Sequence, residues 1–310
     1  MGPRGDRTVQ VLGIPFAVLI LAIFLMMAAS VPLGIIAVLG EGQGRGIDVP
    51  EIGFFVGGIG VALPADIGLE AALIAFWAAN ALFFAAAILG PGRLFFRELR
   101  GTGGGEPSSS YVIAAAKWFS VIVLASLIIG AVQDAVGIPT EPPPAENELV
   151  RFFEVTKASI VEELGFRVIL VGVPMYLLFS DRHSARHLLQ SLWRPGENLR
   201  ADKRKALLVI SAAALVFGIA HITSGEPWSA GKFAQATAAG VIIGWAYFRH
   251  GLVAAVVIHW ATNYFLLSYA HILAGAGEIV DAFLHPVLQS FEIIFVVAGA
   301  VSVAIMLARR

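Results

Sequence analysis

Three short clusters with polar side chains lie within apolar stretches of this sequence, where they could carry out acid–base chemistry. In chain order they are Glu162-Glu163 with Arg167, Phe217 with His221, and His259 with Asn263. An ionisable side chain at membrane depth costs about 2.5–3.5 kcal/mol on insertion scales. A chain that keeps two carboxylates, an arginine and two histidines at such positions is therefore expected to use them.

The first cluster combines an ion pair with a second carboxylate. Glu163 and Arg167 are four residues apart, so they share one face of a helix and can pair. Glu162 points about 100° away around that helix and stays outside the pair. Because adjacent acids in a low dielectric resist ionising together, the second carboxylate suits a general base. The structural alternative is an ion pair that only holds two helices together.

The other two clusters each place a histidine on one helix face with a residue four positions away. Phe217 and His221 are separated by residues small enough to permit close helix contact, and the structural alternative is an interfacial histidine. His259 and Asn263 offer hydrogen-bond donors that could hold the oxygen of a tetrahedral intermediate. Their structural alternative is an interhelical polar clamp worth about 0.6 kcal/mol.

The chain around these clusters is strongly apolar. Its 310 residues are 58% hydrophobic and 14% charged, whereas a soluble domain is about 25% charged. Because the apolar residues form long blocks, the sequence predicts an all-α, polytopic integral membrane protein with a single membrane domain, 1–310. The absence of cysteine excludes disulfides and thiolate ligands, and the net charge of −1 indicates no nucleic-acid partner.

Eight of the apolar blocks are predicted to be membrane helices, since about 20 residues cross the hydrocarbon core. They are Val11–Leu39, Ile67–Leu89, Tyr111–Val132, Phe152–Phe179, Ala206–Thr223, Phe233–Phe248, Leu252–Leu273 and Val287–Leu307. The polar clusters then fall on the fourth, fifth and seventh helices, which predicts a catalytic core within 152–265. The shorter block Ile52–Leu63 is predicted to be a re-entrant or interfacial segment.

Basic residues alternate between the loops. The positive-inside rule therefore places both termini and the basic loop 181–205 in the cytoplasm, with Glu162 and His221 toward the outer face. The first apolar block is longer than the core of a cleaved signal peptide. Because the sequence has no retrieval signal and no long extension, a prokaryotic plasma membrane is the expected location.

Together, Glu-Glu-x-x-x-Arg, Phe-x-x-x-His and His-x-x-x-Asn on successive helices resemble the motifs of the CAAX-protease and bacteriocin-processing (CPBP or ABI) family. The resemblance covers about Phe152–Phe265. This family includes the type II CAAX prenyl endopeptidase, so the resemblance implies an intramembrane protease that removes the C-terminal tripeptide of a prenylated CAAX protein or peptide. Other members of the family act in bacteriocin immunity or processing.

The resemblance also implies a role for each motif residue. The implied catalytic residues are Glu162, His221, His259 and Asn263, and the implied supporting residues are Glu163, Arg167 and Phe217. Glu162 would activate a water molecule with help from His221, and the third motif would stabilise the oxyanion. Membrane lipid and a prenylated or membrane-associated substrate are the expected partners, and the oligomeric state is left open.

Two mechanisms fit these residues. Two histidines and a glutamate, His221, His259 and Glu162, could form a three-ligand catalytic zinc site. Without metal, Glu162 and His221 could polarise the water directly. The metal-free version is favoured, because a zinc-bound Glu162 would leave only Glu163 as the base, and Arg167 is expected to occupy that carboxylate.

Two functions of other classes compete with the protease. Intramembrane glutamate, histidine and arginine also suit an ion- or proton-coupled transporter. The sequence shows no internal repeat of the kind on which many transporters are built, which disfavours this alternative. The third possibility is a scaffold in which the clusters only bind helices together.

Overall fold

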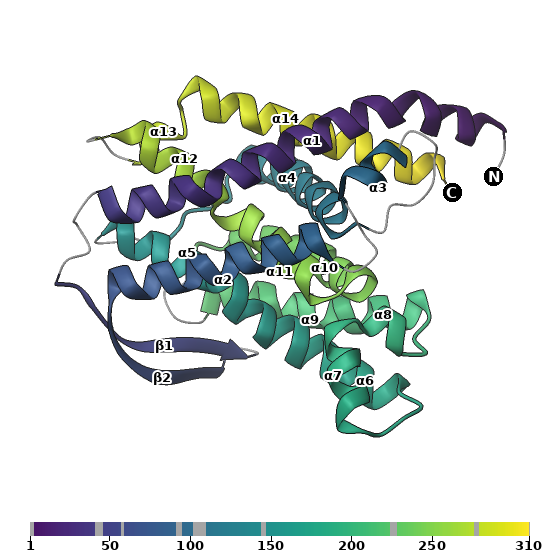
Figure 1. The fold of residues 1–310 in the computed structure, drawn as a ribbon, viewed down its shortest axis with the longest axis horizontal. Coiled ribbons are helices and arrows are strands. Elements are labelled where there is room, and N and C mark those ends of the chain that lie inside the picture. Colours follow the sequence, from purple (N-terminus) through teal and green to yellow (C-terminus); the bar gives the residue numbers. More distant parts are fainter. Residues whose placement is uncertain are drawn as a thin grey trace.

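A computed structural model describes residues 3–40, 46–56, 59–90, 95–101, 110–143, 147–223, 228–275 and 279–309. In chain order, the elements are α1 (Pro3–Gly40), β1 (Asp48–Val56), β2 (Ile59–Gly68), α2 (Leu69–Leu89), α3 (Phe95–Gly101), α4 (Tyr111–Ala135), α5 (Glu148–Glu162), the π-helix η2 (Glu163–Gly172), α6 (Val173–Phe179), α7 (Ala185–Trp193), α8 (Pro195–Asn198), α9 (Lys203–Thr223), α10 (Lys232–His250), α11 (Leu252–Asn263), α12 (Phe265–Ala274), α13 (Ile279–Ala282) and α14 (Pro286–Ala308). The helices form one bundle, in which α1 begins and α14 ends at the same end, away from the β-hairpin (Figure 1).

Six helical segments within the described residues are long and apolar enough to cross a membrane. They are Arg7–Leu39, Leu69–Leu89, Tyr111–Ala135, Lys203–Thr223, Leu252–Ala274 and Pro286–Ala308. They confirm the prediction of an all-α, multi-pass membrane protein. The predicted fourth and sixth membrane helices are also helical, as α5–η2–α6 and α10, but they are not among these six. The number eight therefore stays a prediction.

The segment predicted to be re-entrant or interfacial, Ile52–Leu63, lies in an antiparallel hairpin of two strands. Asp48 pairs with Gly68 at one end of this hairpin, and Val56 pairs with Ile59 at the other. Glycine, valine, isoleucine and phenylalanine dominate the segment, and this composition favours extended backbone over helix. The all-α prediction did not include this hairpin, which the structure adds to the helical bundle.

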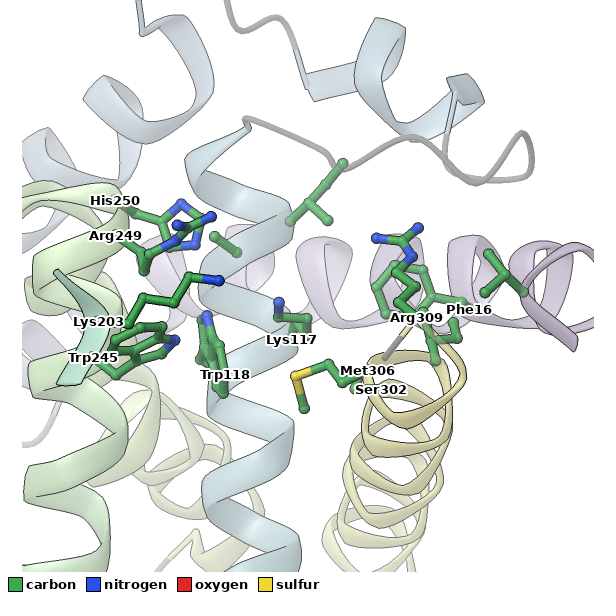
Figure 2. Close-up of a pocket in the computed structure, with 14 residues that line it drawn as sticks. Phe16, Lys117, Trp118, Lys203, Trp245, Arg249, His250, Ser302, Met306 and Arg309 are labelled. Carbon is green, nitrogen blue, oxygen red and sulfur yellow. The ribbon is translucent and has the colours of Figure 1, made fainter. Parts of the chain in front are cut away.

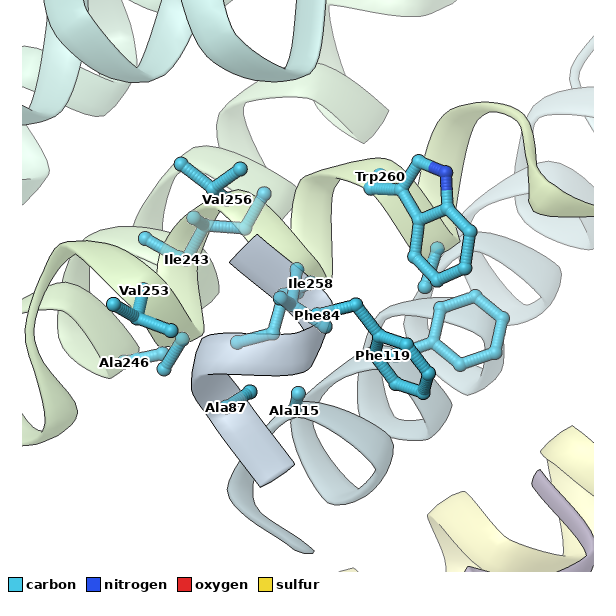
Figure 3. Packing of buried hydrophobic residues seen from close by; sticks show 14 of the residues in the cluster. Phe84, Ala87, Ala115, Phe119, Ile243, Ala246, Val253, Val256, Ile258 and Trp260 are labelled. Atoms are coloured by element: carbon cyan, nitrogen blue, oxygen red, sulfur yellow. The ribbon is translucent and has the colours of Figure 1, made fainter. Parts of the chain in front are cut away.

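Helix α11 lies at the centre of the bundle. Every residue from Leu252 to Ala261 is buried. Figure 3 shows how α2, α4 and α10 pack around this helix, with small residues such as Ala87 and Ala115 beside larger ones such as Phe119 and Trp260. Alanine lets neighbouring helices approach closely, so the surroundings of α11 leave little freedom of movement. His259 therefore stands on a helix that is almost wholly buried.

Helices α9 and α10 pack against each other through glycines. A methyl group added at Gly218 would collide with the Thr237 hydroxyl and would lie 2.9 Å from the Phe233 carbonyl oxygen. Further along α10, a methyl group added at Gly240 or Gly244 would likewise press against Ala214 or Ile210 of α9. The small residues after Phe217 thus permit the close helix contact that the sequence predicts. This contact fixes the part of α9 that carries His221 against the start of α10.

Candidate active site

The two adjacent carboxylates lie where an α-helix changes into a π-helix. Glu162 is the last residue of α5 and Glu163 is the first residue of η2. At the other end of η2, the Val173 N–H donates to the Val168 carbonyl, five residues back. Short π-helical segments within α-helices are frequent at functional sites. The sequence predicts one continuous helix over Phe152–Phe179, so this change of helix type is a finding of the structure.

A buried polar network holds α5 in place just before these carboxylates. The Ser159 hydroxyl donates to Asn80 Oδ1 at 2.8 Å, and the Asn80 amide donates to the Thr156 carbonyl at 3.2 Å. The Ser159 and Tyr264 hydroxyls are 3.2 Å apart. The network ties α2, α5 and the end of α11 together, and a satisfied network of this kind favours a single arrangement. The network therefore fixes the orientation of the end of α5, from which the Glu162 side chain projects.

Glu163 and Arg167 form a buried ion pair. Their side chains are 0% and 2% exposed, and Glu163 Oε2 lies 3.3 Å from Arg167 Nε. Neither atom has a hydrogen-bond partner, so the contact is an ion pair without hydrogen-bond geometry. The guanidinium also lies 4.6 Å above the Phe217 ring. Arg167 thus joins the first motif to the second through a charge on one side and an aromatic face on the other.

His259 lies between the two carboxylates. Its Nδ1 is 2.7 Å from Glu163 Oε1, and its Nε2 is 3.8 Å from Glu162 Oε2. When Nδ1–H donates to Glu163, that bond fixes the orientation of the imidazole ring, as carboxylates do for histidines at many catalytic sites. The Nε2 side of the ring is then directed toward Glu162, which is 23% exposed and so less enclosed than Glu163.

His221 and Phe217 complete the group. His221 Nδ1 lies 2.9 Å from the Phe217 carbonyl oxygen, to which it can donate. The centroid of the Phe217 ring lies 4.5 Å from that of His221 and 6.4 Å from that of His259. The structure therefore brings six of the seven motif residues together. We call this group the acid–histidine cluster; its members are Glu162, Glu163, Arg167, Phe217, His221 and His259.

Asn263 differs from the other six motif residues. It ends α11, it is half-buried, and its side chain forms no hydrogen bond to any described residue. The sequence predicts one helix over Leu252–Leu273, whereas the structure ends α11 here and begins α12 after Tyr264. Asn263 lies four residues after His259 and so on the same helix face. Because its amide forms no hydrogen bond to a described residue, this amide can bind a substrate oxygen.

Lys232 is a neighbour of the cluster that the sequence motifs do not include. It begins α10, and its Nζ lies 3.9 Å from the centroid of the Trp228 ring. The backbone N–H of Trp228 donates to the His221 carbonyl at 3.0 Å, which places Lys232 beside His221. The charge of Lys232 acts on both Glu162 and His221. The sequence feature that could have pointed to Lys232 is its position directly before the predicted membrane helix Phe233–Phe248.

The three residues that could serve as zinc ligands, Glu162, His221 and His259, do not form a three-ligand site in this arrangement. In the part of the chain that the structure describes, no three His, Asp or Glu side chains could hold one metal ion. The Nδ1 atoms of His259 and His221 already contact Glu163 and the Phe217 carbonyl. The mechanism below therefore contains no step through a metal.

Comparison with known proteins agrees with the motifs. Residues 148–265 match the family model described as type II CAAX prenyl endopeptidase Rce1-like. The chain matches no curated protein and no solved structure. The bundle and the match define the class, a multi-pass membrane protein of a CAAX-type protease family. Residues 148–265 hold all seven motif residues, and their match is to the family that the resemblance implied.

Proposed function

We propose that this chain is an intramembrane endopeptidase in which Glu162 activates a water molecule against a peptide bond. The observation that carries the proposal is the position of His259, whose Nδ1 contacts Glu163 and whose Nε2 is directed toward Glu162. A separation of 3.8 Å is too long for a direct hydrogen bond, and polar groups at such distances often share a water. Glu163 thus orients the ring, while Glu162 keeps an oxygen for the reaction.

The proposed reaction needs one proton acceptor and an oxyanion site. Glu162 takes a proton from water, and the water oxygen bonds to the carbonyl carbon of the substrate. His259, through an Nε2–H, and the Asn263 amide donate to the oxyanion that forms. The carbon–nitrogen bond then breaks, and Glu162 returns the proton to the leaving amine. His221 aids by holding the water through Nε2, since its Nδ1 is directed to the Phe217 carbonyl.

We further propose that the substrate is a prenylated CAAX protein or peptide and that the product is its C-terminal tripeptide. Apolar side chains next to the motif residues face outward, with Leu164 39% and Ile219 48% exposed. In a bilayer these side chains would contact acyl chains, where a prenyl group also partitions. An anchored substrate reaches the polar cluster at a lower entropic cost than a free peptide.

The test is cleavage of a farnesylated CAAX peptide by the purified protein in lipid vesicles, with release of the tripeptide followed by mass spectrometry. The same peptide without its farnesyl group is the matched substrate control. We expect release from the farnesylated peptide only. Equal cleavage of both peptides would remove the prenyl requirement, and cleavage of neither would contradict the CAAX assignment and favour another substrate of this family or transport.

A chelator separates the two candidate mechanisms. We propose a metal-free reaction, so a zinc chelator should leave the rate of tripeptide release unchanged. Loss of activity with the chelator and recovery with added zinc would overturn this part of the proposal. A chelated sample must remain folded for the comparison to hold, which the unfolding temperature of the same sample checks.

A further inference from the structure

A second polar site lies at the end of the bundle where α1 begins and α14 ends. It is a cavity of about 290 Å³ between α1, α4, α9, α10 and α14. Basic side chains line it from α4, α9, α10 and the end of the chain after α14: Lys117, Lys203, Arg249, His250 and Arg309. Figure 2 shows the side-chain nitrogens of Lys117, Lys203 and Trp118 directed into one space. We call this cavity the cationic pocket.

The described walls of the cationic pocket supply no carboxylate to balance its charge. No Asp or Glu is among the described residues that line it. Lys117, Lys203 and Arg249 form no ion pair with any residue that the structure places. Arg249 and Arg309 are close enough to Lys117 for their charges to oppose it. Like charges gathered at the ends of membrane helices repel one another, so the described walls of the pocket favour the binding of an anion.

The remaining walls indicate which kind of anion fits. The Lys117 ammonium lies 4.4 Å above the Trp118 ring, and the Trp118 indole N–H is buried without a hydrogen-bond partner. A buried donor of this kind needs an acceptor. Phe16, Ile305 and Met306 give the pocket an apolar side. Lysine, arginine and an indole N–H beside apolar side chains are the groups that bind lipid phosphates between membrane helices.

We propose that the cationic pocket binds a phosphate group, either that of an anionic phospholipid or a free phosphate. Arg249 would bind two phosphate oxygens through its planar guanidinium, and Lys117 and Lys203 would contribute compact charges. The apolar side would take the first carbons of an acyl chain. This site is distinct from the acid–histidine cluster, because Lys203 begins α9 while His221 lies near its other end.

The test measures binding of phosphatidylglycerol, phosphatidylcholine and inorganic phosphate to the full-length protein in non-ionic detergent. Native mass spectrometry counts bound lipid, and the shift in unfolding temperature reports occupancy. We expect phosphatidylglycerol to bind about tenfold or more tightly than phosphatidylcholine. Competition by inorganic phosphate would support the same phosphate chemistry with a soluble source, and its absence would support a lipid. Equal binding of the two lipids without any effect of phosphate would overturn the proposal.

Two variants assign the binding to the pocket. Lys203→Gln and Arg249→Gln should each weaken binding of phosphatidylglycerol about fivefold. Both side chains are exposed, so folding should be preserved. Lys205→Gln is the matched control, because Lys205 is an exposed lysine that does not line the pocket. An equal loss in Lys205→Gln would contradict the proposal, since it would show a general effect of surface charge.

Discussion

The acid–histidine cluster and the cationic pocket lie at opposite ends of α9 and α10, and they balance charge in different ways. About 27 Å of helix separates Lys203 from His221 at about 1.5 Å per residue. In the cluster, Glu163 pairs with Arg167, so opposite charges meet within the protein, and Glu163 also contacts His259. In the pocket, Lys117, Lys203 and Arg249 meet no acid in the described walls.

This difference indicates two uses of charged side chains. Side chains that hold one another in place are ready before a substrate arrives, which is what an electrostatic catalyst needs. A cavity with charge of one sign gains stability only when a ligand enters, so it suits binding. The comparison predicts that changes in the cluster affect rate and stability, whereas changes in the pocket affect lipid binding.

The largest effect on rate among the neighbours of Glu162 should come from His259. His259→Ala removes the group directed toward Glu162 and leaves Glu163 without its imidazole partner. We expect tripeptide release to fall about 10³-fold, or about 4 kcal/mol in barrier. Thr262→Ala on the same helix is the control, because its hydroxyl only donates to the Ile258 carbonyl. A loss of less than tenfold in His259→Ala would contradict the proposed role.

The next effect is on stability, and it contrasts a buried ion pair with an exposed one. Arg167→Met leaves Glu163 buried without its cation and should destabilise the protein by about 3 kcal/mol. Arg151→Met breaks the half-exposed pair with Glu148 and should change stability by less than about 1 kcal/mol. Denaturant unfolding in detergent measures both. Equal losses of stability in the two variants would show that the buried Glu163–Arg167 pair stabilises the protein no more than an exposed pair does.

Asn263 should show a smaller effect, confined to rate. Asn263→Ala removes one proposed oxyanion donor and should lower the maximal rate about 10²-fold, or about 2.7 kcal/mol. Asn263→Asp should be at least as slow, because it replaces a donor by an acceptor. If Asn263 is only a clamp between helices, both variants would lose stability while the folded fraction kept its rate.

The smallest effect is expected for Lys232, which lies beside the cluster without contacting it directly. Its ammonium rests on the Trp228 ring and acts on Glu162 through its charge. Lys232→Gln should lower tripeptide release about fivefold, since charge pairs of this kind are worth about 1 kcal/mol. Lys157→Gln, which removes a lysine paired with the exposed Glu154, is the control. An unchanged rate in Lys232→Gln would remove Lys232 from the site.

The sequence predicts the helical bundle well, because a long apolar block that crosses a membrane must satisfy its backbone hydrogen bonds internally and therefore forms a helix. It also predicts which motif residues share a helix face, since that depends only on local spacing. It predicts neither the π-helix at Glu163 nor the break at Tyr264, because both depend on packing between helices. The cationic pocket could not be predicted from the sequence for the same reason. Lys117, Lys203 and Arg249 come together only when three helices that are distant in the sequence pack against one another.

The measurement that tests the central claim most directly compares tripeptide release by wild type, Glu162→Gln and Glu154→Gln in the same vesicles. Both variants make the same substitution on α5, but Glu154 is 53% exposed and pairs only with Lys157. We predict that Glu162→Gln loses at least about 10³-fold in rate with an unchanged unfolding temperature, while Glu154→Gln keeps the wild-type rate. Substantial release by folded Glu162→Gln would contradict the account.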